Sequence, residues 1–346
     1  MKVKTSNFGK LPDGRPVNLF TFESAKGFVV KITNYGGIIT SIQTPNKLGV
    51  KEEISAGFPS LENYINGHPH FGVMVGRYAN RIANGRFTLD HREYNLPINN
   101  GPNHLHGGNN GFHTKLWDFK LSENKNFASL ELTYNSPHLE EGYPGNVKTT
   151  ITYNLHDTNE IHITFKAVTD EPTHLNLTNH CYFNLGGFKT DVLSHKLTLD
   201  AYAYLPVNEN LIPTGEIRRW DGTAFDLSKP NTLSKKIKEI PGGIDHCFAL
   251  KQPRSLTKPA AKLLHEQSGR WLKVYCTQPG IQVYTGNALD SSIVGHKNTV
   301  YHKYSAVCLE TQHFPDTPNQ PNFPMTLIMP DEEYFHEIRY VFGVIE

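Results

Sequence analysis

The chain has 346 residues, and its 34 basic and 33 acidic residues leave a net charge of only +1. No basic block exceeds a few residues, whereas binding to nucleic acid or to an anionic membrane requires a concentrated basic face, so neither partner is expected. No apolar run approaches the roughly 18 residues of a membrane span. The N-terminal stretch MKVKTSNFGKLPDGRP also lacks the apolar segment of a secretory signal.

Cysteines are few and widely spaced. The four are Cys181, Cys247, Cys276 and Cys308, each within an apolar run. No CxxC pair occurs, so neither a structural zinc nor a redox motif is expected. Free thiols buried in a reducing compartment are the simplest interpretation. The sequence therefore predicts a cytoplasmic protein.

Alternation of apolar and polar residues dominates the chain from one end to the other. In chain order it predicts strands over Val17–Phe22, Phe28–Thr33, Phe87–Leu89, Tyr94–Leu96, Ser129–Tyr134, Lys148–Leu155, Ile161–Val168 and Trp271–Cys276. Turn residues at Asp157–Asn159 and Ser268–Gly269 predict hairpins, and the best helical window, Ser60–Asn66, is short. No repeat or linker interrupts the pattern. The predicted fold is all-β, a large antiparallel β-sandwich that forms a single domain over residues 1–346.

The stretch HLNLTNHCYFNLGG, residues 174–187, carries an unusual polar pattern. If it is a strand, its odd positions apart from Asn179 form an apolar face. Its even positions, from His174 through His180 to Asn184, carry imidazole, amide, hydroxyl and phenol groups but no Lys, Glu or Asp. Such groups bind a hydroxylated ligand. The alternative is a buried polar face that a neighbouring sheet satisfies.

A single carboxylate interrupts the apolar run YSAVCLETQ, residues 304–312. We expect the strand to end at Glu310, just before the Pro- and Asn-rich loop of residues 315–324. A carboxylate in that position can have a raised pKa and act as a general base. The alternative is an ordinary solvated side chain at a strand end.

Three further stretches place polar groups beside apolar runs. In QPGIQVYTGN, Gln282 and Tyr284 share one face of a predicted strand, opposite Ile281 and Val283. In GGIDHCF, Asp245 opens an apolar run after two glycines. In GRYANRI, two arginines flank an asparagine, which suits either sugar hydroxyls or a structural ion pair.

The stretch HLHGG would place His104 and His106 on one strand face, as a metal pair requires. No carboxylate follows at the spacing of a metal site, and no other His and carboxylate group has such spacing, so a catalytic metal is not expected. GxGxxG, Walker, GxSxG, HExxH and EF-hand patterns are absent from the sequence. Dinucleotide, NTP, serine-hydrolase and zinc-protease chemistry are therefore not expected.

Taken together and in order, these segments resemble one family. The series is GRYANRI, LHGG followed by GF and LW, NLTNHCYFNLGG, GGIDHCF, TQPGIQVYTGN, and CLETQHFPD with NQPNFP, spanning Gly76 to Pro324. It resembles the aldose 1-epimerase family, the galactose mutarotases. The resemblance implies a β-sandwich of the galactose mutarotase type with the sugar in an open cleft on one sheet. It also implies interconversion of the α and β anomers of hexoses such as galactose and glucose, without a cofactor.

Carried over motif by motif, the resemblance implies that Glu310 is the general base and His180 the general acid. It implies sugar contacts from Asn80, Arg81, His106, Tyr182, Asp245 and Gln282, and no metal ligand. The sequence departs from the family pattern at Cys181, where many relatives have Ser, and at His174. Since His174 would share the strand face of His180, the choice of sugar stays open.

Ring opening of a hemiacetal needs one group that takes the C1 hydroxyl proton and another that protonates the ring oxygen. We expect a carboxylate and an imidazolium, because opposite charges favour both ionised forms. Three alternatives remain: a glycoside hydrolase that uses Asp245 and Glu310, a hexose-6-phosphate epimerase, and a non-catalytic sugar-binding protein. The expected partner is a free aldohexose, and the protein is expected to be a monomer or a homodimer.

Overall fold

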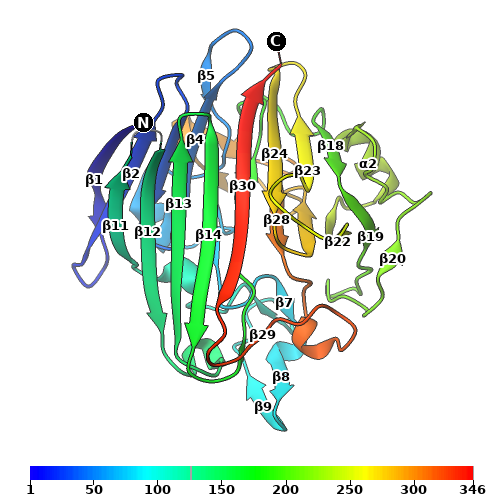
Figure 1. Ribbon diagram of the computed structural model, residues 1–346. Helices are drawn as coiled ribbons and strands as arrows, with labels where there is room; N and C mark the ends of the chain where they lie inside the picture. Colours follow the sequence, from blue (N-terminus) through cyan, green and yellow to red (C-terminus); the bar gives the residue numbers. More distant parts are fainter. Residues whose placement is uncertain (125–126, 346) are drawn as a thin grey trace.

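The computed structural model describes residues 1–124 and 127–345 and is built almost entirely from antiparallel strands (Figure 1). Its largest sheet has nine strands, in the order β11 (Asp118–Glu123), β12 (Phe127–Ser136), β13 (Val147–His156), β14 (Glu160–Thr169), β30 (Tyr334–Val344), β24 (Arg270–Cys276), β23 (Ala261–Leu264), β18 (Lys196–Leu199) and β21 (Asn231–Thr232). Strands β13 and β14 form the hairpin predicted at Asp157–Asn159, and β23 and β24 the one predicted at Ser268–Gly269.

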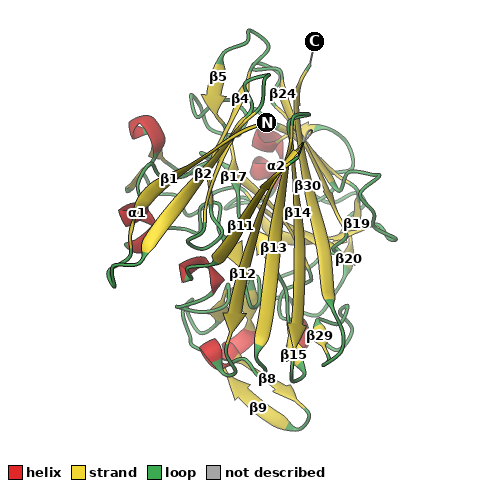
Figure 2. Cartoon of the chain, turned by 60° about the vertical axis from the view of Figure 1, so that its left-hand side comes forward, coloured by secondary structure: helices red, strands yellow, loops and turns green. Residues whose placement is uncertain are grey.

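Two smaller sheets lie behind it in Figure 1. The six-stranded sheet has the order β17 (Tyr182–Phe183), β28 (Val307–Gln312), β25 (Gly280–Tyr284), β22 (Asp245–Leu250), β19 (Ala201–Tyr204) and β20 (Arg218–Arg219). The five-stranded sheet runs β1 (Lys2–Lys10), β2 (Pro16–Glu23), β3 (Val29–Thr33), β4 (Ile39–Pro45) and β5 (Lys51–Glu53). Figure 2 shows β1 and β2 separated from strands β11–β14 and β30 of the nine-stranded sheet.

Apolar side chains of all three sheets meet in one core. Phe20 of the five-stranded sheet, Ile151 of the nine-stranded sheet and Leu309 of the six-stranded sheet belong to the same buried cluster. Burial of this surface is the main free-energy gain of folding. The all-β sandwich is confirmed. That residues 1–346 form a single domain stays a prediction, and residues 125, 126 and 346 of that range lie outside the described residues.

The remaining elements are short. The two-stranded pairs are β6 (Met74–Val75) with β16 (Thr178–Asn179), β7 (Arg81–Ile82) with β10 (His104–Leu105), β8 (Arg86–Leu89) with β9 (Arg92–Asn95), β15 (Thr173–His174) with β29 (Leu327–Ile328), and β26 (Ile293–Val294) with β27 (Val300–Tyr301). Helix α1 (Leu61–Ile65) falls in the predicted window. Helix α2 (Leu233–Glu239) was not predicted. Among the described residues, no helix is long and apolar enough to cross a membrane.

Residues 174–187 do not form the single strand that their alternation suggests. They contribute to three separate short strands, β15, β16 and β17, each paired with a different partner. Both the odd and the even positions from 174 to 185 are buried, so these polar groups do not form a solvated strand face. His174 and His180 therefore do not lie on the same strand face, and the prediction that they do is wrong.

The prediction that β28 ends at Glu310 is also wrong, since the strand continues to Gln312. Glu310 lies inside it, opposite Gln282 of β25. Alternation sends Val307 and Leu309 into the main core and turns Cys308 and Glu310 to the other face. The six-stranded sheet thus presents a face away from the core, and the cavity described next lies on that face.

Candidate active site

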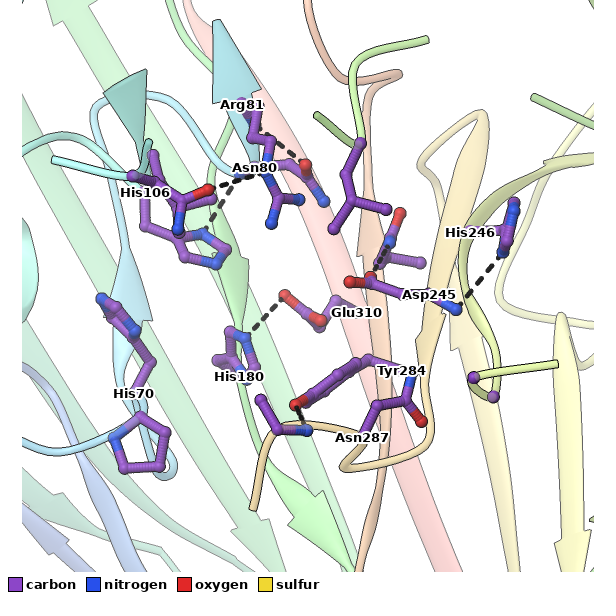
Figure 3. A pocket seen from close by; sticks show the side chains of 18 of the residues that line it. His70, Asn80, Arg81, His106, His180, Asp245, His246, Tyr284, Asn287 and Glu310 are labelled. Carbon is purple, nitrogen blue, oxygen red and sulfur yellow. Dashed lines mark hydrogen bonds and ion pairs between the residues drawn. The ribbon is translucent and has the colours of Figure 1, made fainter. Parts of the chain in front are cut away.

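A cavity of about 600 Å³ opens on the outer face of the six-stranded sheet. Three adjacent strands supply its floor, with Glu310 from β28, Gln282 and Tyr284 from β25, and Asp245 from β22. Loops and short strands supply the walls, which include His70, Asn80, Arg81, His106 and His180 (Figure 3). The volume and the mixture of polar and aromatic groups suit a small polar ligand.

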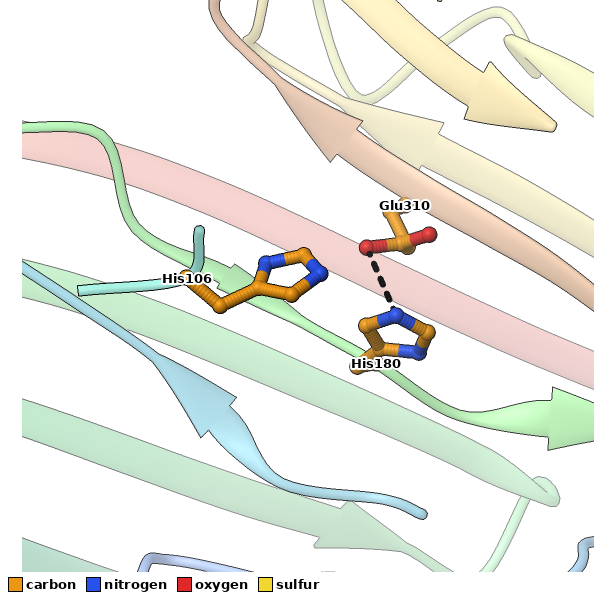
Figure 4. Close-up of side chains that lie close together, drawn as sticks. All are labelled: His106, His180 and Glu310. Carbon is orange, nitrogen blue, oxygen red and sulfur yellow. Dashed lines mark ion pairs between the residues drawn. The ribbon is translucent and has the colours of Figure 1, made fainter. Parts of the chain in front are cut away.

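At the base of the cavity, His180 and Glu310 face one another (Figure 4). The His180 Nε2 and Glu310 Oε2 atoms are 3.4 Å apart, and the two side chains are only 6% and 2% exposed. Within the described chain neither Glu310 Oε2 nor His180 Nδ1 has a hydrogen-bond partner. A buried polar atom without a partner is costly, so Glu310 Oε2 would gain from a closer approach to His180 Nε2. Catalytic contacts are often this long before substrate binds.

Burial sets the protonation of this pair. It raises the pKa of the Glu310 carboxyl well above its usual range, the neighbouring Asp245 raises it further, and Arg81 opposes both. Burial lowers the pKa of the His180 imidazole well below its usual range, and nearby His70 lowers it further. The expected carboxylate–imidazolium pair is therefore not favoured in this buried site, because loss of water penalises both charges. The neutral pair and the ion pair nevertheless hold the same single proton and differ only in where it resides.

Polar side chains around the pair are already held in place by protein contacts. Gln282 Nε2 donates to Asp245 Oδ1 at 2.6 Å, and Arg81 Nε donates to the side-chain oxygen of Asn100 at 3.0 Å. Burial raises the pKa of Asp245, while Arg81 and the Gln282 bond oppose the shift. Such prior organisation lowers the entropy cost of binding a small polar ligand.

Two residues in the walls of the cavity have an unusual backbone conformation. Asn80 has φ +65° and His106 has φ +53°, both in the left-handed region that side chains other than Gly seldom occupy. The Asn80 backbone N–H donates to His106 Nδ1 at 3.2 Å, and the Asn80 side-chain oxygen accepts from the Arg81 N–H at 2.9 Å. Residues held this way cluster at functional sites.

One group of side chains could hold a metal ion. Nitrogen and oxygen atoms of His106, His180 and Glu310 lie within 4.8 Å of one another, although their sequence spacing gave no sign of this. Because His106 Nδ1 accepts a backbone hydrogen bond, a neutral His106 carries its proton on Nε2. A protonated nitrogen cannot bind a metal. The hydrogen bonding therefore favours His106 as a donor to a ligand oxygen.

All eight residues that the sequence singled out line this cavity: Asn80, Arg81, His106, His180, Tyr182, Asp245, Gln282 and Glu310. Tyr182 packs nearly parallel to His180, with ring centroids 5.0 Å apart, and its hydroxyl donates to the Pro69 carbonyl at 2.7 Å. Their roles in binding and catalysis stay predictions.

His174 is placed elsewhere. It is buried against Phe87, its Nδ1 contacts the Thr326 hydroxyl at 2.9 Å, and burial lowers its pKa to about 4. His104 is also separate from the cavity: its two ring nitrogens contact the Pro97 carbonyl and the Tyr143 hydroxyl. The expected shared face of His104 and His106 does not form, because the left-handed backbone at His106 turns the chain.

Sequence reasoning missed His70, Asn100 and His246, which also line the cavity. His246 directly follows Asp245, and its alternation in β22 predicts the opposite face. His70 and Asn100 lie in turns where no period applies. Only the approach of distant segments reveals them.

Comparison with known proteins gives one consistent answer. A sequence model of the aldose 1-epimerase family matches residues 18–341. The galactose mutarotase of Sus scrofa is 46% identical over 347 residues, with 99% of each chain covered, and the aldose 1-epimerase of Escherichia coli K12 is 35% identical with 96% of each covered. Among solved structures, galactose 1-epimerase from Lactobacillus acidophilus superposes with a TM-score of 0.86 at 28% identity, covering 100% of this chain and 99% of that one.

Proposed function

Because the chain belongs to the aldose 1-epimerase family, whose members are isomerases, we propose that His180 and Glu310 are the acid–base pair with which it interconverts sugar anomers. The substrate is a free aldohexose, with galactose and glucose as the first candidates. One observation carries the assignment: the two groups face each other at 3.4 Å, buried at the base of a polar cavity.

Ring opening moves two protons. In the form whose shared proton resides on His180, Glu310 takes the proton of the C1 hydroxyl as His180 gives one to the ring oxygen, the C1–O5 bond breaks, and the open chain carries an aldehyde at C1. Rotation about C1–C2 then presents the other face of the carbonyl. On reclosure each group reverses its role, so both must be able to hold the proton. Desolvation raises the pKa of Glu310 and lowers that of His180, so it opposes their ordinary preference for the ion pair and lets the shared proton reside on either group.

The other cavity residues hold the rest of the sugar while C1 turns. Gln282 is the strand partner of Glu310. Asp245 also stands beside Glu310, while Arg81, Asn80 and His106 stand on another side of the pair (Figure 3). Their amide, guanidinium, imidazole and carboxylate groups offer both donors and acceptors to hydroxyls. Holding C2 to C6 and leaving C1 free is what this reaction requires.

The alternatives are less well supported. The relatives are named as mutarotases and epimerases, which does not favour a glycoside hydrolase or a non-catalytic binder. Of the described residues that line the cavity, Arg81 is the one Lys or Arg, and its guanidinium already contacts Asn100. A 6-phosphate would normally require more positive charge.

We further propose a reducing compartment such as the cytoplasm, because all four cysteines are buried free thiols. The oligomeric state is proposed as monomer or homodimer. A sugar-sized cavity without an extended basic lining supports a small-molecule partner and not nucleic acid.

Polarimetry of freshly dissolved α-galactose and α-glucose tests the function. Wild-type protein should accelerate the drift to the equilibrium rotation of both sugars. His180→Asn should lower the rate roughly 10²- to 10⁴-fold. His174→Asn is the matched control, since His174 lies outside the cavity and should keep the rate within a few-fold. If His180→Asn were as active as His174→Asn, the assignment of the acid would be wrong.

A further inference from the structure

His70 lines the cavity but has no part in the mechanism above. It stands in a turn before β6, with φ +62°, and its backbone N–H donates to the His68 carbonyl at 2.9 Å. Within the described residues neither ring nitrogen of His70 makes a hydrogen bond, and neither is one of the fully buried polar atoms that lack a partner. The cavity wall therefore presents an imidazole with an unused donor and an unused acceptor.

The position of His70 relative to the acid–base pair is defined. Its ring is nearly parallel to that of His180, with centroids 5.9 Å apart and an interplanar angle of 24°. In Figure 3, His180 lies between His70 and Glu310, and Asp245 lies on the far side of Glu310. The order across the cavity is thus His70, His180, Glu310, Asp245.

The chemistry of a pyranose ring maps onto this order. The ring oxygen is bonded to C1 on one side and to C5 on the other, and C5 carries C6. When Glu310 takes the C1 hydroxyl and His180 protonates the ring oxygen, C2 and C3 extend toward Asp245. C5 and its C6 hydroxymethyl group then extend past His180, toward His70.

We infer that His70 binds the C6 hydroxyl of the sugar and makes the site prefer hexoses over 6-deoxyhexoses. This inference rests on the proposed acid–base pair, because that pair orients the ring. An imidazole suits the task, since one nitrogen can donate to a hydroxyl while the other accepts from it. A neutral imidazole serves best, and burial lowers the pKa of His70 to about 4.

The competing explanation is that His70 only packs against His180. Its ring also lies 4.8 Å from that of His106 and 4.9 Å from that of His113, so a packing role is physically reasonable. The two roles predict different results. Loss of packing slows the enzyme on every sugar, whereas loss of a C6 contact slows it only on sugars that carry the C6 hydroxyl.

The experiment compares kcat/KM for D-galactose and for D-fucose, which is 6-deoxy-D-galactose, in wild-type and variant proteins. His70→Phe keeps a ring against His180 and removes both nitrogens. His70→Asn keeps a residue that accepts the left-handed backbone and removes the ring. His246→Asn is the matched control, the same chemical change at another histidine of the cavity wall, next to Asp245.

Wild-type protein should prefer galactose. Both His70 variants should lose roughly three- to tenfold of the galactose-to-fucose ratio, the value of one neutral hydrogen bond, and the His246 variant should keep the ratio. A ratio within twofold of wild type in both His70 variants would overturn the inference, as would an equal loss on the two sugars. If instead the acid–base assignment were wrong, the result would be different: the Glu310→Gln variant would remain active.

Discussion

Replacement of Glu310 by Gln removes the proposed base with little other change. The amide has the size of the carboxyl group and retains one oxygen that can accept a hydrogen bond from the C1 hydroxyl, but it cannot take the proton. Burial already favours the neutral carboxyl in the sugar-free site, so the amide resembles the form that the native side chain adopts there. The floor of the cavity, with Gln282 opposite on β25, should be preserved.

The expected effects on rate and on binding differ in size. Removing a positioned base costs about 10²- to 10⁴-fold in rate, or about 3 to 5 kcal/mol of barrier. A hydrogen bond to a charged group contributes roughly 1.5 to 3 kcal/mol, and an amide in its place recovers part of that. Sugar affinity should therefore change less than the rate does.

Polarimetry for the rate and calorimetry for galactose affinity, on the same preparations, measure both effects. Glu310→Asp serves as a partner variant: it retains a carboxylate but draws it back from His180, and should keep more activity than Glu310→Gln. The double variant with His180→Asn should lose much less than the product of the single losses, because the two groups act as a unit. Turnover of Glu310→Gln within a few-fold of wild type would refute the mechanism, even though the family assignment would stand.

Four further outcomes are expected. The pH–rate curve should be bell-shaped with a wide plateau, because the pair works with one proton: the acid limb, where the pair gains a second proton, should lie below the ordinary histidine pKa of 6.5, and the alkaline limb, where it loses the one, above the ordinary glutamate pKa of 4.5. An acid limb above pH 6.5 or an alkaline limb below pH 4.5 would contradict this. Activity should survive a strong chelator, and loss with recovery on adding a divalent ion would instead assign a metal to the cluster of two histidines and a glutamate. Asp245→Asn should mainly raise KM and also move the alkaline limb to lower pH, since the Asp245 charge raises the Glu310 pKa; a large fall in kcat at unchanged KM would place Asp245 in the chemistry. Arg270→Met should lower the free energy of unfolding by about 3 to 5 kcal/mol in urea titrations and leave kcat unaffected. The reason is that the buried Arg270 guanidinium contacts Glu52 at 2.8 Å and joins β24 to the five-stranded sheet. A loss of less than about 1 kcal/mol, the size expected of an ordinary surface substitution, would show that the sheets do not depend on this contact.

The sequence by itself determined the all-β class and most of the long strands. Period-2 alternation is a local property, and a strand such as β13 or β14, with one face in the core, displays it directly. The site residues came from a different source, since the ordered motifs resembled a family. Spacing alone left His180 and Glu310 with structural alternatives, because neither a polar strand face nor a single glutamate specifies chemistry.

Only the tertiary structure decided which of these side chains meet. Residues 174–187 alternate like one strand, yet each of their short strands pairs with a different segment, so His180 reaches the cavity while His174 packs against Phe87. Those contacts are set by pairing with segments that are distant in the sequence, and the local alternation of residues does not indicate which segments pair. The protonation of the pair was decided in the same way. A glutamate and a histidine ordinarily suggest an ion pair, but burial favours the neutral form of each side chain, and burial is a property of the whole fold.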